Sequence, residues 1–420
     1  MSSRRKFIKY ILSGIIGFPL LKGIRANYKP KVVVIGGGFG GSTVIKYLEK
    51  YIDKLDLILI EKKKNFYTCP FSNYVIGGFR DINQNKFSYH NMIKRGVNVV
   101  FDNVKYIDSE NKKIQLNNIK ISYDWLVLSP GIGFKWDSII GFNKKDSIKY
   151  PIAWSGGEDS SMLFKKINSL EDNSKLIIVP PDYPYRCPPA PYERACLIAH
   201  FLKKKKRKFK IIILDKKDSF TKKELFLSVW KKLYPNSIEW IPRSKGGIVN
   251  EFNSKENYVV LKSGQKVFGD FFNLIPDQKA SDLIFSSRLS SQEWCQINPV
   301  TFALKNHSNI HVIGDSINAW DMPKSAFSAY SQAKVCAENL KNIIFENKIE
   351  APVFLNTCYS LAAENYGFSI SSWYRTNSEK NRIVSLGSKS SPTNASNAER
   401  AREARESYDW YSSITQELYS

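Results

Sequence analysis

Histidine and cysteine are scarce in this chain of 420 residues, which has four histidines and six cysteines. No two cysteines have C-x-x-C spacing, and no C-x-x-C-H haem-attachment motif occurs. The sequence therefore predicts no metal site and no haem on this chain. Acidic residues are also few, because 39 Asp and Glu stand against 63 Lys and Arg, for a formal charge of +24. Two explanations of that charge stay open: a lysine-rich surface set by base composition, or an acidic partner or anionic substrate.

Long hydrophobic runs are missing too. The apolar stretch at residues 10–21 is too short to span a bilayer. It follows Ser3-Arg4-Arg5-Lys6-Phe7-Ile8-Lys9, which closely resembles a twin-arginine pattern, and Ala26 offers a small-residue cleavage point. We expect residues 1–26 to be a twin-arginine export signal and the mature protein to fold without stable membrane insertion; an uncleaved anchor is the alternative. No basic helix interleaved with aromatic residues stands out, so nucleic acid is not an expected partner.

The clearest motif is a dinucleotide fingerprint near the start of the chain. A β-branched run at residues 31–35 leads into glycines, of which Gly36, Gly38 and Gly41 fit G-x-G-x-x-G. A helical pattern follows, and a second apolar run at 55–60 ends on Glu61, twenty residues after Gly41. The glycines allow a tight turn and close approach of a pyrophosphate to a helix N-terminus, and Glu61 can accept hydrogen bonds from a ribose.

A second α/β unit opens with a strand at 175–179, but its turn is built differently. Residues 180–191 contain six prolines and no glycine. Proline has no N–H to offer a phosphate, so this unit resembles a Rossmann fold that lacks a nicotinamide site. NAD(P)H is therefore not an expected electron donor. The basic run at 203–208 fits the C-terminal end of the following helix, with a docking patch as the alternative.

Later segments would return the chain to the nucleotide. A strand at 97–104 ends on Val104, and the turn after the strand at 123–128 contains Gly131. A strand ending in Gly314-Asp315 offers a carboxylate to a ribityl hydroxyl. Lys324 and Ser325 then precede a helix at 327–340 rich in small residues, whose N-terminus suits an anionic ring edge.

Four motifs together resemble the flavoprotein subunit of flavocytochrome c sulfide dehydrogenase. They are Cys69-Pro-Phe-Ser-Asn-Tyr-Val-Ile-Gly-Gly78, Tyr185-Arg-Cys-Pro-Pro-Ala-Pro-Tyr-Glu-Arg194, Met322-Pro-Lys-Ser-Ala-Phe-Ser-Ala329 and Asn356-Thr-Cys-Tyr-Ser360. The resemblance covers nearly the whole chain. It implies two Rossmann-like (glutathione-reductase-like) domains with a small α+β C-terminal domain. The expected units are the FAD-binding domain at 27–150 and 276–350, the second Rossmann-like domain at 151–275, and a C-terminal redox and interface domain at 351–420.

The resemblance also implies roles for individual residues. Cys69 matches the position that bonds FAD covalently, and Cys187 and Cys358 match a redox-active disulfide beside the flavin. Trp410 loosely matches an aromatic next to the flavin. Glu193 is a candidate proton acceptor, or a charge on the helix dipole. Arg186 and Lys324 are candidate attractors of hydrosulfide, or solvated surface cations. The residues expected to contact FAD are Gly36, Gly38, Phe39, Gly41, Glu61, Lys62, Cys69, Val104, Gly131, Asp315, Lys324, Ser325 and Trp410.

The implied activity is oxidation of hydrosulfide. The anion attacks the Cys187–Cys358 disulfide, which leaves one persulfide and one thiolate, and electrons pass through FAD to the haem of a partner c-type cytochrome in a periplasmic heterodimer. A membrane-facing sulfide:quinone oxidoreductase is the alternative, although residues 388–420 are polar for a membrane element. An NADH-dependent reductase conflicts with the proline-rich turn. A redox-inactive flavin-binding protein stays open as a non-enzymatic alternative.

Overall fold

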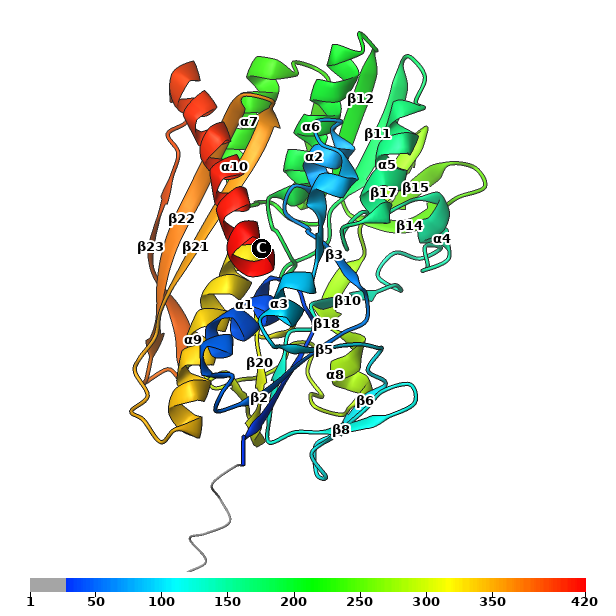
Figure 1. Cartoon of the computed structure of the whole chain (residues 1–420). Helices are drawn as coiled ribbons and strands as arrows, with labels where there is room; N and C mark the ends of the chain where they lie inside the picture. Colours follow the sequence, from blue (N-terminus) through cyan, green and yellow to red (C-terminus); the bar gives the residue numbers. More distant parts are fainter. Residues whose placement is uncertain (1–27) are drawn as a thin grey trace, which may run out of the picture.

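The computed structural model describes residues 28–420. The expected export signal, residues 1–26, lies outside the described residues. Figure 1 shows the N-terminal sheet at the bottom, a second α/β unit at the upper right and a C-terminal sheet along the left. The expected fold class is confirmed, because two Rossmann-like sheets are joined to an α+β C-terminal unit.

The first sheet is organised around β1. Its strands in spatial order are β19 (Ala303–Leu304), β20 (His307–Val312), β9 (Trp125–Leu128), β1 (Lys31–Ile35), β2 (Asp56–Glu61) and β5 (Asn98–Phe101). β1 pairs in parallel with β2 and β9, and its three valines are fully buried, as in a strand covered on both faces. The carboxyl end of β1 therefore delivers Gly36 to the sheet edge where ligands bind in such folds. Helices α1 (Phe39–Leu48) and α9 (Ala326–Ile344) pack against each other.

In the second sheet all of the strand pairs are parallel. Its strands in spatial order are β13 (Ile238–Ile241), β12 (Phe209–Leu214), β11 (Ser174–Val179) and β17 (Phe271–Leu274). The proline-rich turn joins β11 to α6 (Ala190–Lys204), and α7 (Lys223–Leu233) follows β12. A two-stranded antiparallel ladder of β10 (Ile132–Lys135) and β18 (Asp277–Ala280) lies where the chain leaves the first unit and returns to it.

The C-terminal unit is a long antiparallel meander with one helix. β21 (Val353–Ala363), β22 (Tyr366–Asn377) and β23 (Arg382–Ser390) form the sheet, and α10 (Asn397–Tyr419) packs against β22. Figure 1 shows α10 in red, crossing in front of the strands toward the N-terminal unit. Its last turn reaches the glycine fingerprint, where the Tyr419 hydroxyl donates to the Gly37 carbonyl at 3.3 Å. No helix within residues 28–420 is long and apolar enough to cross a membrane.

Several element boundaries differ from the sequence-based expectation. β5 ends at Phe101, so Val104 lies beyond it, and residues 106–122 form three short strands, β6 (Tyr106–Asp108), β7 (Lys113–Gln115) and β8 (Lys120–Ser122). The polar segment at 388–406 contains the end of β23 and the start of α10. That helix starts where Ser396 and Glu399 form a capping box, a local sequence signal for a helix N-terminus.

Candidate active site

One continuous cavity joins the glycine fingerprint to the cysteine motifs of the second and third units. Its lining includes Gly36, Gly38 and Glu61 at one end and Cys187 and Cys358 at the other. The cavity lies where the three units meet, since these residues come from the first sheet, the proline-rich turn and β21. An elongated ligand with a phosphate-containing end therefore fits between the fingerprint and the cysteines.

The fingerprint end has the geometry of a dinucleotide site. Gly36 has φ of +96°, and a Cβ there would lie 2.4 Å from the Ser129 carbonyl oxygen, so only glycine fits this turn. The Glu61 carboxylate accepts the N–H groups of Gly37 at 2.8 Å and Lys63 at 3.1 Å. Glu61 is thus fixed at the end of β2 and also lines the cavity.

The middle of the cavity offers polar atoms that have no hydrogen-bond partner among residues 28–420. Asp315 Oδ2 lies 3.2 Å from Arg186 Nε, but Asp315 Oδ1 is buried without a hydrogen-bond partner, as is Trp154 Nε1. Both residues line the cavity. Buried polar atoms are normally hydrogen-bonded, so an acceptor and a donor left over here fit a ligand that carries hydroxyl and carbonyl groups. These residues fit FAD.

The two cysteines at the other end are in contact. Cys187 and Cys358 come from the proline-rich turn and from β21, both line this end of the cavity, and they lie close enough for each thiol to shift the pKa of the other. Both are free cysteines in the structure, so the disulfide itself stays a prediction. The turn is held in place because the Cys187 N–H donates to the Lys324 carbonyl at 2.7 Å. Cys187 adopts φ of +57°, a conformation that is costly for a residue with a side chain.

Glu193 lies beside the cysteine pair on the first turn of α6. Its carboxylate accepts the Leu361 N–H at 2.9 Å and the Asn73 amide at 2.7 Å. Burial raises the pKa of this carboxyl, although the two hydrogen bonds oppose the shift. Arg194 is buried next to it, where its guanidinium bonds the Asn73 and Asn273 side chains, and burial lowers its pKa to about 9.

Lys222, which the sequence analysis did not single out, supplies a cation at the same place. It is buried, and its ammonium donates to the Cys358 carbonyl at 2.8 Å and to the Ser360 hydroxyl at 2.7 Å. The residue precedes α7 at the far end of the loop after β12. In a chain with 63 Lys and Arg, composition alone cannot distinguish this one lysine from surface lysines.

Cys69 lies in the cavity apart from the redox pair. Arg186 Nη1 donates to Cys69 Sγ at 2.8 Å, while Arg186 Nε faces Asp315. One arginine therefore connects the cysteine of the first motif, the carboxylate after β20 and the turn that carries Cys187. Cys69 is half-buried and lines the cavity, as expected for a thiol that is accessible to a bound ligand.

In the second Rossmann unit, the acidic residue after the second strand is already bonded to other side chains. Asp215 directly follows β12, at the position where such folds bind a ribose, but it is fully buried. Its carboxylate accepts from Tyr192 at 2.6 Å, Trp240 at 3.0 Å and the Lys217 ammonium at 2.7 Å. The Lys217 ammonium also bonds the Pro181 carbonyl at 2.6 Å. The polar groups that would hold a dinucleotide instead brace the proline-rich turn.

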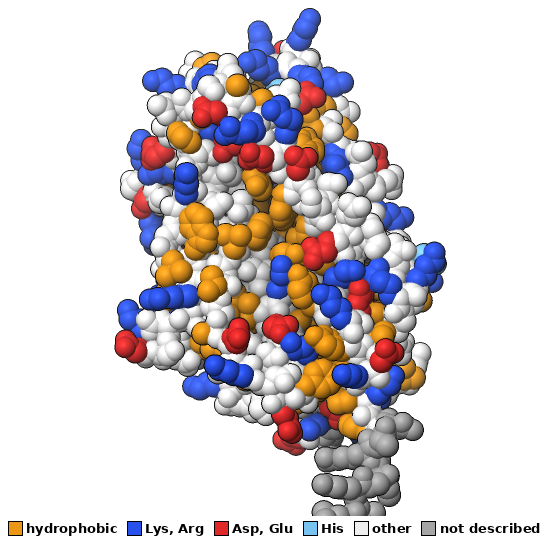
Figure 2. Space-filling model, turned by 60° about the vertical axis from the view of Figure 1, so that its left-hand side comes forward, with side chains coloured by type: hydrophobic (Ala, Val, Ile, Leu, Met, Phe, Trp, Pro, Cys, Tyr) orange, Lys and Arg blue, Asp and Glu red, His pale blue; other side chains and the backbone are white. Residues whose placement is uncertain are grey.

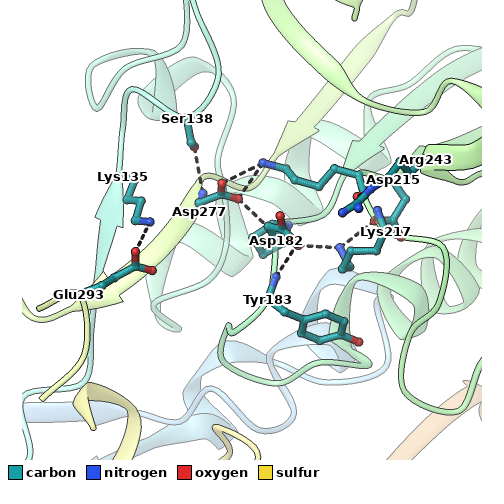
Figure 3. Close-up of polar contacts among 11 residues, drawn as sticks. Lys135, Ser138, Asp182, Tyr183, Asp215, Lys217, Arg243, Asp277 and Glu293 are labelled. Carbon is teal, nitrogen blue, oxygen red and sulfur yellow. Dashed lines mark hydrogen bonds and ion pairs between the residues drawn. The ribbon is translucent and has the colours of Figure 1, made fainter. Parts of the chain in front are cut away.

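Figure 3 shows this bracing from the side of β18. Asp277 accepts the Asp182 N–H at 2.8 Å and the Lys216 ammonium at 2.9 Å, and its own N–H donates to Ser138. The turn that carries Cys187 is thus tied to β12 and to β18, on both sides.

Most of the residues expected to contact FAD line this cavity, but three do not. Those in the lining are Gly36, Gly38, Phe39, Glu61, Lys62, Cys69, Gly131, Asp315, Ser325 and Trp410. Val104 packs against the first core instead, and Gly41 faces β1 rather than the cavity. Lys324 points away from the cavity, because its ammonium donates to the carbonyls of Asp315 and Ile317. The role of Lys324 in attracting hydrosulfide stays a prediction, with its ammonium outside the cavity lining, and burial lowers its pKa to about 8.

The C-terminal unit closes the cavity with aromatic side chains. Trp410 of α10 stacks on Phe327 of α9 with ring centroids 5.8 Å apart, and Tyr359 of β21 lies 6.3 Å from the indole. Ser325 caps α9 through its hydroxyl, which also donates to the Asn356 side chain. Within residues 28–420, no group of three or more His, Cys, Asp and Glu side chains is arranged to hold a metal ion.

Comparison with known proteins gives three family matches along the chain. Residues 160–276 match the central domain of the sulfide dehydrogenase [flavocytochrome c] flavoprotein chain, and residues 350–419 match the flavin-binding domain of flavocytochrome c sulphide dehydrogenase. Residues 30–150 match the pyridine nucleotide-disulphide oxidoreductases. The three matches cover each of the units that contribute to the cavity.

The similar individual proteins and solved structures also include sulfide-oxidising flavoproteins. A sulfide dehydrogenase [flavocytochrome c] flavoprotein chain from Chlorobaculum thiosulfatiphilum is 53% identical over 45 residues, which are 11% of this chain and 94% of that sequence. The mitochondrial sulfide:quinone oxidoreductase of Dictyostelium discoideum is 25% identical over 370 residues, 81% of this chain and 78% of that protein. The crystal structure of the sulfide:quinone oxidoreductase of Aquifex aeolicus superimposes with a TM-score of 0.71 at 16% identity, over 93% of this chain and 92% of that chain.

Proposed function

Because this chain belongs to the family of the flavoprotein chain of flavocytochrome c sulfide dehydrogenase, a family of sulfide-oxidising flavoproteins, we propose that it oxidises hydrosulfide at Cys187 and Cys358 and delivers the electrons to a partner c-type cytochrome. The observation that carries the proposal is the meeting of these two cysteines, from distant segments, at one end of a cavity whose other end is a dinucleotide fingerprint. A flavin and a dithiol pair in one cavity are the parts that a two-electron sulfide oxidation needs.

The chemical step at the cysteines is a thiol–disulfide type exchange. The sulfur of hydrosulfide bonds to one cysteine sulfur, the bond between the two cysteines breaks, and the other cysteine leaves as a thiolate. The product is a cysteine persulfide that still carries the proton of the hydrosulfide. FAD, when bound, supplies a two-electron acceptor that can pass electrons on one at a time.

Glu193 is the group that we propose to receive the persulfide proton. It lies against the pair, and its orientation is fixed by Asn73 and Leu361. A carboxyl whose pKa is raised by burial exchanges protons closer to neutral pH than an exposed one does. Arg194 remains a hydrogen-bonded scaffold for Asn73 rather than a proton donor.

An anaerobic titration of the purified yellow protein with sulfide, in parallel with NADH, tests the proposal. We expect sulfide to bleach the flavin or to produce a long-wavelength charge-transfer band, and NADH to have no effect, because Asp215 is already bonded to Tyr192, Trp240 and Lys217. Rapid reduction by NADH with no response to sulfide would contradict the proposal and favour a reductase.

The electron acceptor is proposed from the surface beside the cavity. Figure 2 turns the side that carries β21–β23 toward the viewer, and hydrophobic side chains gather there in a band bordered by both basic and acidic side chains. Val353, Leu355 and Trp373 are exposed apolar residues of these strands, and Leu355 pairs directly with Trp373. The band is continuous in the chain with Tyr359 at the cavity wall, which supports docking of a protein partner close to the redox site.

Sulfide:quinone oxidoreductase activity is the second candidate, because the Dictyostelium and Aquifex proteins are similar over most of the chain. The same apolar band would then face a quinone or a membrane surface. Parallel assays of the sulfide-reduced protein with a soluble quinone and with a c-type cytochrome separate the two candidates. Faster oxidation by the quinone than by every cytochrome tried would favour this alternative.

Covalent attachment of FAD is proposed at Cys69, which Arg186 contacts in the cavity. Replacing Cys69 with serine should move all of the flavin into the supernatant after acid precipitation, because the hydroxyl cannot form the thioether. In the unmodified protein the flavin should stay in the pellet, and intact-mass measurement should show the added FAD. Cys336→Ala, at a buried position of α9, is the matched control and should keep the flavin attached. Free flavin from the unmodified protein would contradict the attachment.

Export is proposed from the sequence of residues 1–26. The twin-arginine pattern and Ala26 support delivery of a folded protein to the periplasm. The N-terminus of the protein isolated from its own host tests this, because cleavage after Ala26 leaves Asn27 first. An intact Met1 in the isolated protein would contradict processing.

A further inference from the structure

We propose that Lys222 is the positioning residue that keeps the reduced cysteine pair anionic at neutral pH, with the negative charge on Cys358. The inference deepens the proposed function and rests on it for its role in turnover. Lys222 is buried, and its ammonium is bonded to the carbonyl of Cys358 itself and to Ser360 two residues further along β21. The cation is therefore attached to the strand that carries one of the two sulfurs.

The ammonium of Lys222 has no carboxylate bonded to it within the described part of the chain. Both of its bonds go to neutral acceptors, so its charge is not neutralised by a direct partner. A buried cation of this kind requires a nearby anion for stability. The charge of Glu193 reaches Lys222, and when the disulfide is reduced a thiolate at Cys358 supplies a second anion on the same residue whose carbonyl Lys222 bonds.

Several charged and titratable groups face the pair, and among the cations it is Lys222 whose charge lowers the pKa of Cys358, while Glu193 opposes it. Glu193 and Arg194 approach from α6, Arg186 and Tyr185 from the turn, Tyr374 from β22, and Lys222 from the start of α7. The interaction with Cys187 and the charge of Lys222 lower the pKa of Cys358 against the opposing effects of burial and Glu193, while the interaction with Cys358 and burial raise the pKa of Cys187. The thiolate therefore resides on Cys358, where it persists to lower pH than an ordinary thiolate and is lost as the pH falls through the lowered pKa.

The backbone supports the same placement. Lys222 has φ of +65°, in the left-handed region that lysine rarely adopts, immediately before α7 begins. Lys222 is buried, whereas the next residue, Lys223, is partly exposed and pairs with Glu224. Two adjacent lysines thus have opposite environments, which gives a matched pair for experiment.

Site-resolved alkylation of the reduced holoprotein tests the proposal. The protein is reduced with dithiothreitol, desalted anaerobically and treated with iodoacetamide between pH 5.5 and 9.5, and the modification of each cysteine is measured by mass spectrometry. We expect Cys358 to react first, with a midpoint below the value of about 8.5 for a free cysteine. In Lys222→Gln, alkylation of Cys358 at pH 7 should be about tenfold slower or more, with the profile moved to higher pH. Lys222→Arg and Lys223→Gln should keep the profile of the unmodified protein.

The outcomes separate this proposal from the proposed function. Glutamine can still donate a hydrogen bond to the Cys358 carbonyl, so a merely structural role for Lys222 would leave the profile unchanged, and that result would overturn the proposal. First modification at Cys187 would overturn it as well. If the Lys222 variants fail to retain flavin, the unmodified protein still tests the proposal. A midpoint at or above about pH 8.5 for alkylation of Cys358 would contradict a stabilised thiolate. Sulfide is absent from this assay, so a failure to oxidise sulfide would contradict only the proposed function.

Discussion

Replacing Cys187 with serine is expected to slow reduction of the flavin by sulfide by about a thousandfold or more. A serine hydroxyl cannot form the bond to Cys358 that hydrosulfide must attack, so the exchange step has no electrophilic sulfur. The rate of flavin bleaching after anaerobic mixing with sulfide measures the effect. Because Cys187 lies at the end of the cavity opposite the fingerprint, flavin content should stay close to that of the unmodified protein.

The controls for this variant distinguish lost chemistry from lost structure. Dithionite should reduce the serine variant and the unmodified protein alike, since it needs no cysteine. Cys336→Ala removes a buried thiol of α9 and should keep the sulfide response. Bleaching of the serine variant by sulfide at an undiminished rate would mean that sulfide reduces the flavin without the cysteine pair.

The fingerprint could be predicted from the sequence because all of its signals are local. The buried β-strand, the glycines and Glu61 occupy one continuous stretch, and the structure bonds Glu61 back to Gly37 as the motif requires. The lack of a nicotinamide site is likewise predicted from the sequence, because the turn after β11 contains no glycine. What the sequence could not show is that Lys217 and Asp277 fasten that turn, because these contacts join segments far apart in the chain.

The cysteine pair is different, because its two halves are separated by most of the second unit. Spacing alone offers no reason to join Cys187 to Cys358, and the pairing came from the resemblance. The structure also places Lys222 at the pair, and Lys222 is itself a left-handed residue immediately before α7. A buried lysine has no distinct sequence signal in a lysine-rich chain.

Lys324 shows how a correct motif can mislead about one side chain. The motif at 322–329 does line the cavity through Ser325, Ala326 and Phe327. The lysine within it turns the other way, over the Trp294 ring at 3.6 Å, and bonds backbone carbonyls of the loop after β20. Its main-chain carbonyl, which no sequence pattern would identify, is the part that contacts the Cys187 turn.

Substitution of two glycines in the fingerprint should separate folding from cofactor binding. Gly41 lies in the first turn of α1, and a Cβ there would be 1.8 Å from the Gly36 carbonyl oxygen, which is backbone and cannot move aside cheaply. Gly41→Ala is therefore expected to lower the free energy of unfolding by about 3 kcal/mol and to yield protein with little flavin. Thermal unfolding of the purified protein and its flavin-to-protein absorbance ratio measure the two effects.

Gly38→Ala is the matched variant with the opposite expectation for stability. A Cβ on Gly38 would meet only the Phe66 ring, at an ordinary 3.7 Å, and φ of −73° suits any residue. Gly38 nevertheless lines the cavity, whereas Gly41 does not. The flavin-free Gly38→Ala protein should unfold within about 0.5 kcal/mol of the flavin-free unmodified protein, while its flavin content falls. Full flavin content in Gly38→Ala would show that the cofactor does not approach the backbone at this turn, and the assignment of the cavity's fingerprint end to FAD would then be wrong.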